Sequence, residues 1–282
     1  MNPGTDPTVL SHPAGPTDPD VSVLSLRDAK TKRPLALYAN YSLHYVGGQT
    51  SGGVSADYFG EFARVMPSRL RAGEEFVAMM TNGTSGDINN IPFGSVRPPR
   101  EPFEQMRLVA AKAADAAWHA ERKMDPYRGD VRLSMNQREL TLTTRRPTKE
   151  QLDRAKEVLA EKDDKKLPPL ARAYAGRAVA LASGGEKLKA VLQVVRIGDI
   201  AICAIPFEVF VEIGLDLKKR SPFSRTIVVG LANGYNGYLP TPEQHKLGGY
   251  ETWLGTNRVQ EDASVLITNE LLDMLAQIAK NK

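Results

Sequence analysis

The sequence predicts an α/β fold, in which a layered mixed β-sheet domain is flanked by helices. Two observations lead to this prediction. Short apolar runs with the length or alternation of strands recur along the chain, and longer segments with helical spacing of apolar residues separate them. Such alternation is typical of layered domains. Because no repeat or low-complexity linker interrupts the pattern, we expect an extended segment over residues 1–20 and a single domain over 21–282.

The N-terminal half of the domain predicts strands that alternate with helices. The strands are expected at residues 21–26, 35–41 and 76–80. The helices are expected at 57–72, ended or interrupted near Pro67, and at 101–124, where alanines recur at helical spacing. Polar loops follow two of the strands: a Gly/Ser-rich loop over 42–56, and the stretch TNGTSGDINNIPFG after the third strand.

The C-terminal half continues the same alternation. Residues 131–144 alternate apolar and polar side chains, which predicts a hairpin or a strand pair. Thr148 and Gln151 form a capping-box pattern that begins a helix. Pro206-Phe207-Glu208 is expected to open another helix. The remaining elements are expected as helices at 149–163, 169–183 and 262–280, and as strands at 191–197, 200–205 and 225–231.

Composition excludes several classes of protein. The 37 basic and 33 acidic side chains give a net charge of +4, and the basic clusters are short, so we expect no nucleic-acid partner. No apolar run approaches the roughly 20 residues of a transmembrane segment. The N-terminus lacks the basic and apolar regions of a signal peptide. The single cysteine, Cys203, lies in an apolar strand pattern and is expected to be a buried, inert thiol.

The stretch GLANGYNGYLPTPEQHKLGGYETW, residues 230–253, is the most informative about function. It holds three Tyr, five Gly, two Pro and a His after an apolar strand. Gly and Pro shape the backbone of a loop, and Tyr places a hydroxyl at the end of a rigid apolar body. Polar loops at strand ends commonly carry the sites of α/β proteins. The stretch is therefore either a site loop or an ordinary surface loop with aromatic anchors.

Polar or small residues follow four of the expected strands. If the carboxyl ends of these strands converge, one crevice collects His44, Asp87, Asn89, Glu208, Tyr238 and Tyr250. Histidine nitrogen and carboxylate or phenolate oxygen are competent zinc ligands. Two simpler interpretations remain open. His44 can be a histidine satisfied in the core, and Glu208 can occupy the first turn of a helix, where the helix dipole favours an acid.

Four segments, taken in order, resemble the neutral/alkaline (non-lysosomal) ceramidase family. NYSLH, residues 40–44, resembles the family's NWFAVHPTSM stretch, and FVAMMTNGTSGDINN, residues 76–90, resembles its FVA and SSNLGDVSPN stretches. IPFE, residues 205–208, resembles the PGE segment. Residues 230–250 resemble the GL-N-Y--Y-TT-EEY---RY pattern. The resemblance covers the chain from about residue 20 to its end.

The resemblance implies a role for each matched residue. His44, Glu208 and Tyr238 fall on zinc ligands of the family, and Tyr250 falls on a tyrosine that stabilises the oxyanion during amide hydrolysis. In such a site, zinc lowers the pKa of a bound water and polarises the carbonyl. Asp57 matches an acidic position of the family. It can orient the ligand His44 from outside the metal's own ligand set, or it can cap the helix that follows.

The sequence departs from the family at two places. The family has a further zinc-binding histidine in an upstream HTHSGP-like segment, whereas His12 in SHPAGP lacks that context, so the chain resembles an N-terminally shortened member. In GDINN, which contains Asp87, Asn89 stands where the family has a serine at the reaction centre. An amide is not a useful nucleophile but can position water or substrate. His245 replaces a tyrosine and is either a solvent-facing residue or a substrate contact.

Three functions follow as hypotheses. The first is a zinc-dependent hydrolase that cleaves an N-acyl amide by metal-activated water, with catalytic residues Tyr250, Asn89 and Asp87 and metal ligands His44, Glu208 and Tyr238. The second is a catalytically degenerate relative that binds a lipid or protein partner without turnover. The third is a sugar-processing enzyme with Asp87 and Glu208 as paired carboxylates, about 5–10 Å apart. The expected substrate is a small-molecule or lipid amide, with membrane-surface contact, and the resemblance suggests a secreted or periplasmic location.

Overall fold

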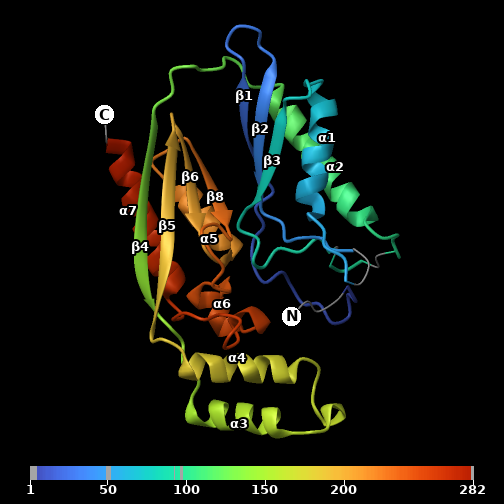
Figure 1. Ribbon diagram of the computed structural model, residues 1–282, viewed down its shortest axis with the longest axis vertical. Helices are drawn as coiled ribbons and strands as arrows, with labels where there is room; N and C mark the ends of the chain where they lie inside the picture. The colour runs from blue at the N-terminus through green and yellow to red at the C-terminus, as the bar shows by residue number, and fades with distance from the viewer. Residues whose placement is uncertain (1–4, 49–51, 92, 96–97, 281–282) are drawn as a thin grey trace.

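The computed structural model confirms the α/β prediction (Figure 1). Two open sheets, each flanked by helices, lie side by side, and a two-stranded ladder lies near one end of both. The structure describes residues 5–48, 52–91, 93–95 and 98–280. Parts of the predicted segment 1–20 and of the predicted loop 42–56, namely residues 1–4 and 49–51, lie outside the described residues. The single domain over 21–282 stays a prediction.

The first sheet has the order β1-β2-β3, formed by β1 (Val21–Arg27), β2 (Pro34–Tyr41) and β3 (Val77–Asn82). β1 and β2 are antiparallel, and β2 and β3 are parallel. Helices α1 (Asp57–Leu70) and α2 (Glu104–Glu121) cover one face (Figure 1). Their core includes Leu37, Phe62 and Met66, which are fully buried. The alternation in β2 thus points one set of side chains at the helices.

The second sheet has the order β4-β5-β6-β8. Its strands are β4 (Leu133–Thr143), β5 (Lys187–Ile197), β6 (Ile200–Ile205) and β8 (Arg225–Gly230). β6 and β8 are parallel, and the other pairs are antiparallel. Helices α5 (Val211–Arg220) and α7 (Ala263–Lys280) bury one face of this sheet, where Leu192, Cys203 and Leu271 are inaccessible to solvent. Burial raises the pKa of the Cys203 thiol to about 12, in agreement with the expected inert role.

A helical hairpin projects from one end of the second sheet (Figure 1). It consists of α3 (Lys149–Ala160), the 3-10 turn η1 (Asp164–Lys166) and α4 (Ala171–Ser183). The predicted capping box is confirmed, because Thr148 and Gln151 each accept a hydrogen bond from the other's backbone N–H. Ala155, Ala175 and Ala178 form the small core between the two helices.

Two predicted elements were wrong. Residues 131–144 do not form a hairpin or strand pair: they contain one 11-residue strand, β4, which pairs along its whole length with β5. That long pairing also starts β5 at Lys187, earlier than predicted. Pro206-Phe207-Glu208 does not open a helix. Glu208 lies in the short strand β7 (Glu208–Val209), and α5 begins at Val211, so Glu208 does not occupy a first helical turn.

The two sheets meet at the carboxyl ends of β2, β3 and β8. The Asn40 side chain, near the end of β2, donates a hydrogen bond to the Val228 carbonyl of β8 at 3.3 Å. Gly230 approaches the chain after β3 so closely that a Cβ there would lie 2.9 Å from the Gly83 carbonyl oxygen. β6 runs parallel to β8 and pairs Ile205 with Gly230, so its end lies at the same place. Four predicted strand ends therefore converge, although the strands belong to two sheets and not to a single one.

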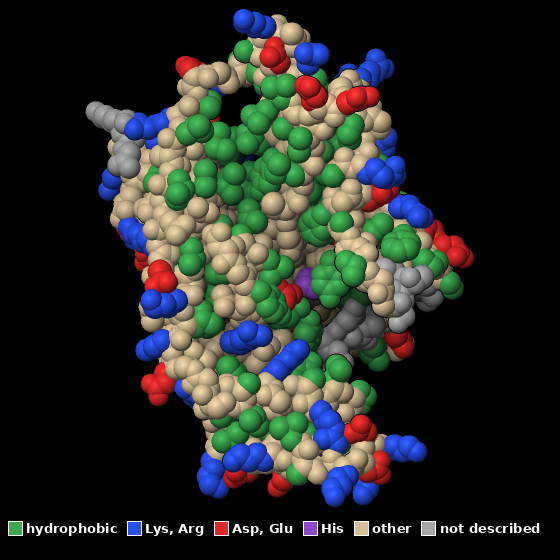
Figure 2. All heavy atoms as spheres, viewed as in Figure 1, with side chains coloured by type: hydrophobic (Ala, Val, Ile, Leu, Met, Phe, Trp, Pro, Cys, Tyr) green, Lys and Arg blue, Asp and Glu red, His purple; other side chains and the backbone are tan. Residues whose placement is uncertain are grey.

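The opposite faces of both sheets carry apolar side chains that are open to solvent. Leu133 and Met135 of β4 are exposed, as are Val77 and Met79 of β3. Figure 2 shows apolar side chains gathered over the second sheet and beside the first. Among the described residues, no helix is long and apolar enough to cross a lipid bilayer.

Candidate functional site

Glu208 and Tyr238 lie side by side because two very short strands pair. β7 runs parallel to β9 (Tyr238–Leu239), with Glu208 and Tyr238 as register partners. The Glu208 N–H donates to the Gly237 carbonyl at 2.9 Å, and the Tyr238 N–H donates to the Thr256 carbonyl at 3.0 Å. The ladder joins the segment after β6 to the segment after β8. It therefore fixes two predicted site residues by backbone hydrogen bonds.

Two glycines permit the close approaches around this ladder. Gly237 has φ +84°, and a Cβ there would lie 2.3 Å from the Thr256 carbonyl oxygen. Gly86, in the GDINN segment, donates its N–H to the Val209 carbonyl at 2.8 Å. A Cβ at Gly86 would lie 2.7 Å from the Glu208 carbonyl oxygen. The loop after β3 can therefore pack on β7 only with glycine at this position.

His44 reaches the same place from the end of β2. Its backbone N–H donates to the Ile88 carbonyl at 3.1 Å, which ties it to the GDINN segment. Its ring Nε2 lies 3.8 Å from the Glu208 Oε2, and the two side chains are only 17% and 12% exposed. The ring is stacked at 6.4 Å from the Tyr238 ring, measured between centroids. His44 is thus held next to a carboxylate near the surface, and not as an isolated core histidine.

Tyr250 completes the group. The chain after β9 forms the short helix α6 (Pro242–Leu247) and the 3-10 turn η2 (Tyr250–Thr252). The Tyr250 and Tyr238 hydroxyl oxygens lie 2.7 Å apart, and the two rings meet edge to face. Burial raises the pKa of Tyr238, and the Tyr250 hydroxyl and the Glu208 carboxylate raise it further. Burial also raises the pKa of Tyr250, so both hydroxyls are protonated at neutral pH in the absence of a metal.

Glu208, Tyr238 and Tyr250 open onto a cavity of about 320 Å³, and His44 lies beside it, next to Glu208. Its lining is rich in aromatic and basic side chains: Tyr45, Tyr174, Arg177, Glu208, Tyr235, Tyr238, Tyr250, Gly255, Thr256 and Arg258. Figure 2 shows a histidine beside an acidic side chain in a hollow near the middle of this face, with basic side chains next to them. Tyr235 is 58% exposed and forms part of the cavity wall.

Asp87 and Asn89 lie beside this group and not on the cavity wall. The Asp87 carboxylate accepts a hydrogen bond from the Val211 N–H at 2.9 Å, at the start of α5. Burial, together with the charge of Glu212, raises the pKa of Asp87 to about 7. Asn89 is exposed, one residue after Ile88, whose carbonyl binds the His44 backbone. Asp87 therefore ties the loop after β3 to α5, and Asn89 presents its amide to solvent.

The sequence left two alternative roles open for Asp57 and two for His245. The Asp57 carboxylate accepts hydrogen bonds from the N–H groups of Val46 and Gly47, at 3.0 and 2.7 Å. It therefore anchors the loop just after His44. His245 lies in α6, and its Nε2 is buried with no hydrogen-bond partner among the described residues. Burial, and then the charge of Arg145, lowers the pKa of His245.

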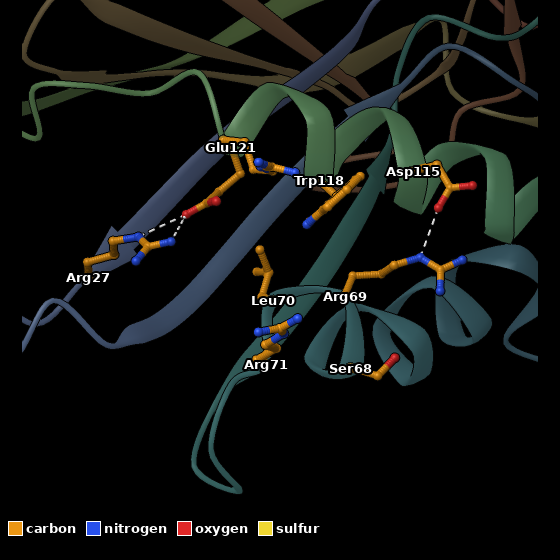
Figure 3. A pocket seen from close by; sticks show the side chains of 9 residues that line it. Arg27, Ser68, Arg69, Leu70, Arg71, Asp115, Trp118 and Glu121 are labelled. Carbon is orange, nitrogen blue, oxygen red and sulfur yellow. Dashed lines mark hydrogen bonds and ion pairs between the residues drawn. The ribbon is translucent and has the colours of Figure 1, made fainter.

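A larger surface cavity, of about 690 Å³, lies away from the predicted residues, where α1 and α2 end beside β1. Figure 3 shows that its acidic residues are already engaged, Glu121 by Arg27 and Asp115 by Arg69. It contains none of the residues in the four matched segments. We therefore place the candidate site at the smaller cavity.

Two of the predicted donors, His44 and Glu208, have a spacing compatible with a shared zinc ion. Zinc bonds of 2.0–2.2 Å at tetrahedral angles place two ligands about 3.4 Å apart. The 3.8 Å between His44 Nε2 and Glu208 Oε2 is close to that spacing and too long for a hydrogen bond. Among the described residues, no group of three His, Cys, Asp or Glu side chains is placed to hold a metal. The candidate set of metal ligands instead consists of one histidine, one glutamate and Tyr238.

Sequence reasoning missed the basic side of the cavity. Arg177 comes from α4, and Arg258 follows the turn at residues 253–256. Neither residue lies in a matched segment. The only signal in the sequence was the proximity of Arg258 to the tyrosine-rich stretch.

Comparisons with known proteins support the fold. No protein-family model matches the sequence, and no curated protein matches it. The crystal structure of neutral ceramidase from Pseudomonas aeruginosa matches with a TM-score of 0.70 and 18% identity, over 93% of this chain and 47% of that chain. A ceramidase complexed with C2 matches with a TM-score of 0.70 and 17% identity, over 94% and 48%. The chain thus spans about half the length of the ceramidase structures it matches. This likeness shows that the chain has a ceramidase-like fold, as its motifs predicted.

Proposed function

We propose that this protein is a zinc-dependent hydrolase that cleaves an N-acyl amide bond. One observation carries the proposal. Glu208, Tyr238 and Tyr250 line one cavity of a ceramidase-like fold, and His44, from a segment far apart in the sequence, lies next to Glu208 and Tyr238. The same four residues match the site residues of the ceramidase family in the sequence alone. Motif and geometry therefore support the same group independently.

In this proposal, His44, Glu208 and Tyr238 hold the metal. Three protein ligands leave a fourth position open, as in catalytic zinc sites. When bound, zinc supplies a water of lowered pKa and a Lewis acid for the substrate carbonyl. The β7–β9 ladder orients Glu208 and Tyr238, and the Ile88 carbonyl orients the backbone of His44. Rigid placement of this kind favours a site that needs little rearrangement.

Tyr250 is the proposed oxyanion donor. Its hydroxyl lies 2.7 Å from the Tyr238 hydroxyl, and burial keeps it protonated. As negative charge develops on the carbonyl oxygen, the Tyr250 hydroxyl can donate a hydrogen bond to that oxygen. Asp87 acts through position, by tying the loop after β3 to α5. Asn89 offers an exposed amide that can hydrogen-bond substrate or water but cannot act as a nucleophile.

Asn89 also favours a second candidate function. If the reaction requires the family's serine, the site binds an amide lipid without turnover. No observation favours paired carboxylates, since Asp87 is engaged at the start of α5 and is absent from the cavity wall.

A panel of fluorogenic N-acyl amides, tested on zinc-loaded protein, separates these functions. We expect hydrolysis, and Tyr250→Phe should lower kcat about 100-fold or more while leaving zinc content unchanged. Tyr127→Phe is the matched control, since Tyr127 lies by β1 and α2, and should retain kcat. Binding of the amides without release of amine would favour the non-catalytic function. An unchanged kcat in Tyr250→Phe would refute its role.

A further inference from the structure

The basic side of the cavity is built by contacts between α4 and the turn at residues 253–256. Gly255 has φ +87°, and a Cβ there would lie 2.5 Å from the Arg177 Cβ, so α4 sits directly on this turn. Arg177 Nη1 donates to the Thr256 Oγ1 at 3.3 Å. Tyr174 meets Trp253 edge to face, with ring centroids 5.2 Å apart. The helical hairpin thus brings Arg177 to the cavity that contains Glu208.

Arg258 lies on the same wall. Its guanidinium is 5.6 Å from the centre of the Tyr235 ring, and the guanidinium of Arg177 is 5.2 Å from the centre of the Tyr174 ring. Contact with aromatic faces holds an arginine in place while its N–H groups stay available at the ring edge. Both tyrosines line the cavity.

Neither arginine is neutralised by an acid. No ion pair between described residues includes Arg177 or Arg258. Among the described residues that line the cavity, Glu208 is the only acid, and it also lies 3.8 Å from His44 and is a proposed metal ligand. Both arginines line the cavity together with Tyr174 and Tyr235, on which their guanidinium groups lie. The cavity therefore has two cations with unused hydrogen-bond donors.

We propose that the ligand of this cavity carries an anionic group, a carboxylate or a phosphate, close to its amide, and that Arg177 and Arg258 receive that group. A neutral N-acyl amine would leave both guanidinium groups without an anionic partner among the described residues. An anion gains charge-assisted hydrogen bonds, which guanidinium forms in a fork that matches carboxylate and phosphate oxygens. The position of the amide in this inference rests on the proposed function, whereas the preference for an anion rests on the arginines alone.

Direct binding tests the preference without requiring turnover. The test is a calorimetric titration of the full chain with three ligands that share one acyl chain. They are an N-acylglycine, an N-acylethanolamine and the O-phosphate of that N-acylethanolamine. We expect each of the two anions to bind at least about 10-fold tighter than the neutral amide. Inorganic phosphate should compete with both, and added salt should weaken both. If only one anion is preferred, it identifies the natural group.

Variants assign the preference to the two arginines. Arg177→Gln and Arg258→Gln should each reduce the ratio of anionic to neutral affinity, and the double variant should bring it close to 1. Arg258→Lys should keep part of the preference, which separates charge from packing. Arg154→Gln is the control, because Arg154 is an exposed arginine on α3 with its own partner, Glu157. Thermal unfolding would verify that each variant is folded.

The outcomes distinguish this inference from the proposed function. Equal affinity for all three ligands, absence of binding, or a preference that survives the double variant would overturn the inference, even if neutral amides are hydrolysed. An anion preference that depends on both arginines, without release of amine from any ligand, would support the inference and refute the proposed hydrolysis.

Discussion

Glu208 and Tyr238 are register partners in the parallel ladder of β7 and β9, and this pairing is the basis of the candidate site. The two residues are 30 positions apart, and neither belongs to a long regular element. Backbone hydrogen bonds, and not side-chain packing alone, set their spacing. The site should therefore be sensitive to backbone changes in the flanking glycines.

Gly237→Ala tests this sensitivity. A Cβ at this position would lie 2.3 Å from the Thr256 carbonyl oxygen, and φ is +84°. We expect a loss of about 2 kcal/mol or more in the free energy of unfolding, measured by urea titration, and a weaker metal site. Gly73→Ala is the control, since no atom lies within 4 Å of its Cβ position. Equal stability of the two variants would contradict the role given to the ladder.

Asp87 should make stability depend on pH. Burial and Glu212 raise its pKa to about 7, above the ordinary value of 3.8. The folded state therefore holds a proton that the unfolded chain has lost, and the free energy of unfolding should fall as pH rises from about 4 to about 7. The fall from this group is at most about 4 kcal/mol.

Asp87→Asn keeps the acceptor for the Val211 N–H and removes the titration. Its free energy of unfolding should change less than that of the wild type between pH 4 and pH 7. Glu212→Gln should move the wild-type transition to lower pH, because it removes the second cause of the raised pKa. Identical pH profiles for the wild type and Asp87→Asn would show that Asp87 titrates normally.

Glu121 and Arg27 form the ion pair on which the packing of β1 against α2 depends. The Glu121 side chain is only 3% exposed, and its Oε1 accepts from Arg27 Nε at 2.8 Å and from the Tyr127 hydroxyl at 2.8 Å. Arg27→Met leaves a buried carboxylate without its cation and should cost about 3–5 kcal/mol in urea unfolding. Tyr127→Phe should cost about 1 kcal/mol.

The double variant Arg27→Met/Glu121→Leu separates pairing from packing. It removes both charges and should recover most of the loss, because apolar replacements of a buried pair are often neutral. If Arg27→Met is as mild as Tyr127→Phe, the Glu121 carboxylate does not depend on its cation.

The sequence was sufficient for most regular elements, and it named the residues of the candidate site. Elements such as β2, β8 and α7 carry recognisable patterns of apolar residues. Such patterns can be identified from the local sequence alone. β7 and β9 could not be predicted, because a strand of two residues is too short to show an alternation of apolar and polar side chains. These strands exist only because they pair with each other. For the same reason, Glu208 was expected in a helix.

The basic side of the cavity depends on tertiary packing. Arg177 reaches the cavity because α4 sits on Gly255, a contact between segments about 80 residues apart that no local pattern indicates. The prediction for β4 failed for a different reason. The alternation of apolar and polar side chains was recognised, but the pairing of β4 along the whole of β5 was not. The candidate site residues were predicted from motifs, whereas their neighbours required the fold.

Zinc titration of the metal-free protein by calorimetry tests the central claim most directly. The account predicts one zinc per chain, with affinity lowered about 100-fold or more by His44→Ala and by Glu208→Gln. His119→Ala, which changes an exposed histidine on α2, should bind zinc as the wild type does. Absence of saturable binding by the folded protein, or binding that survives both substitutions, would contradict the account.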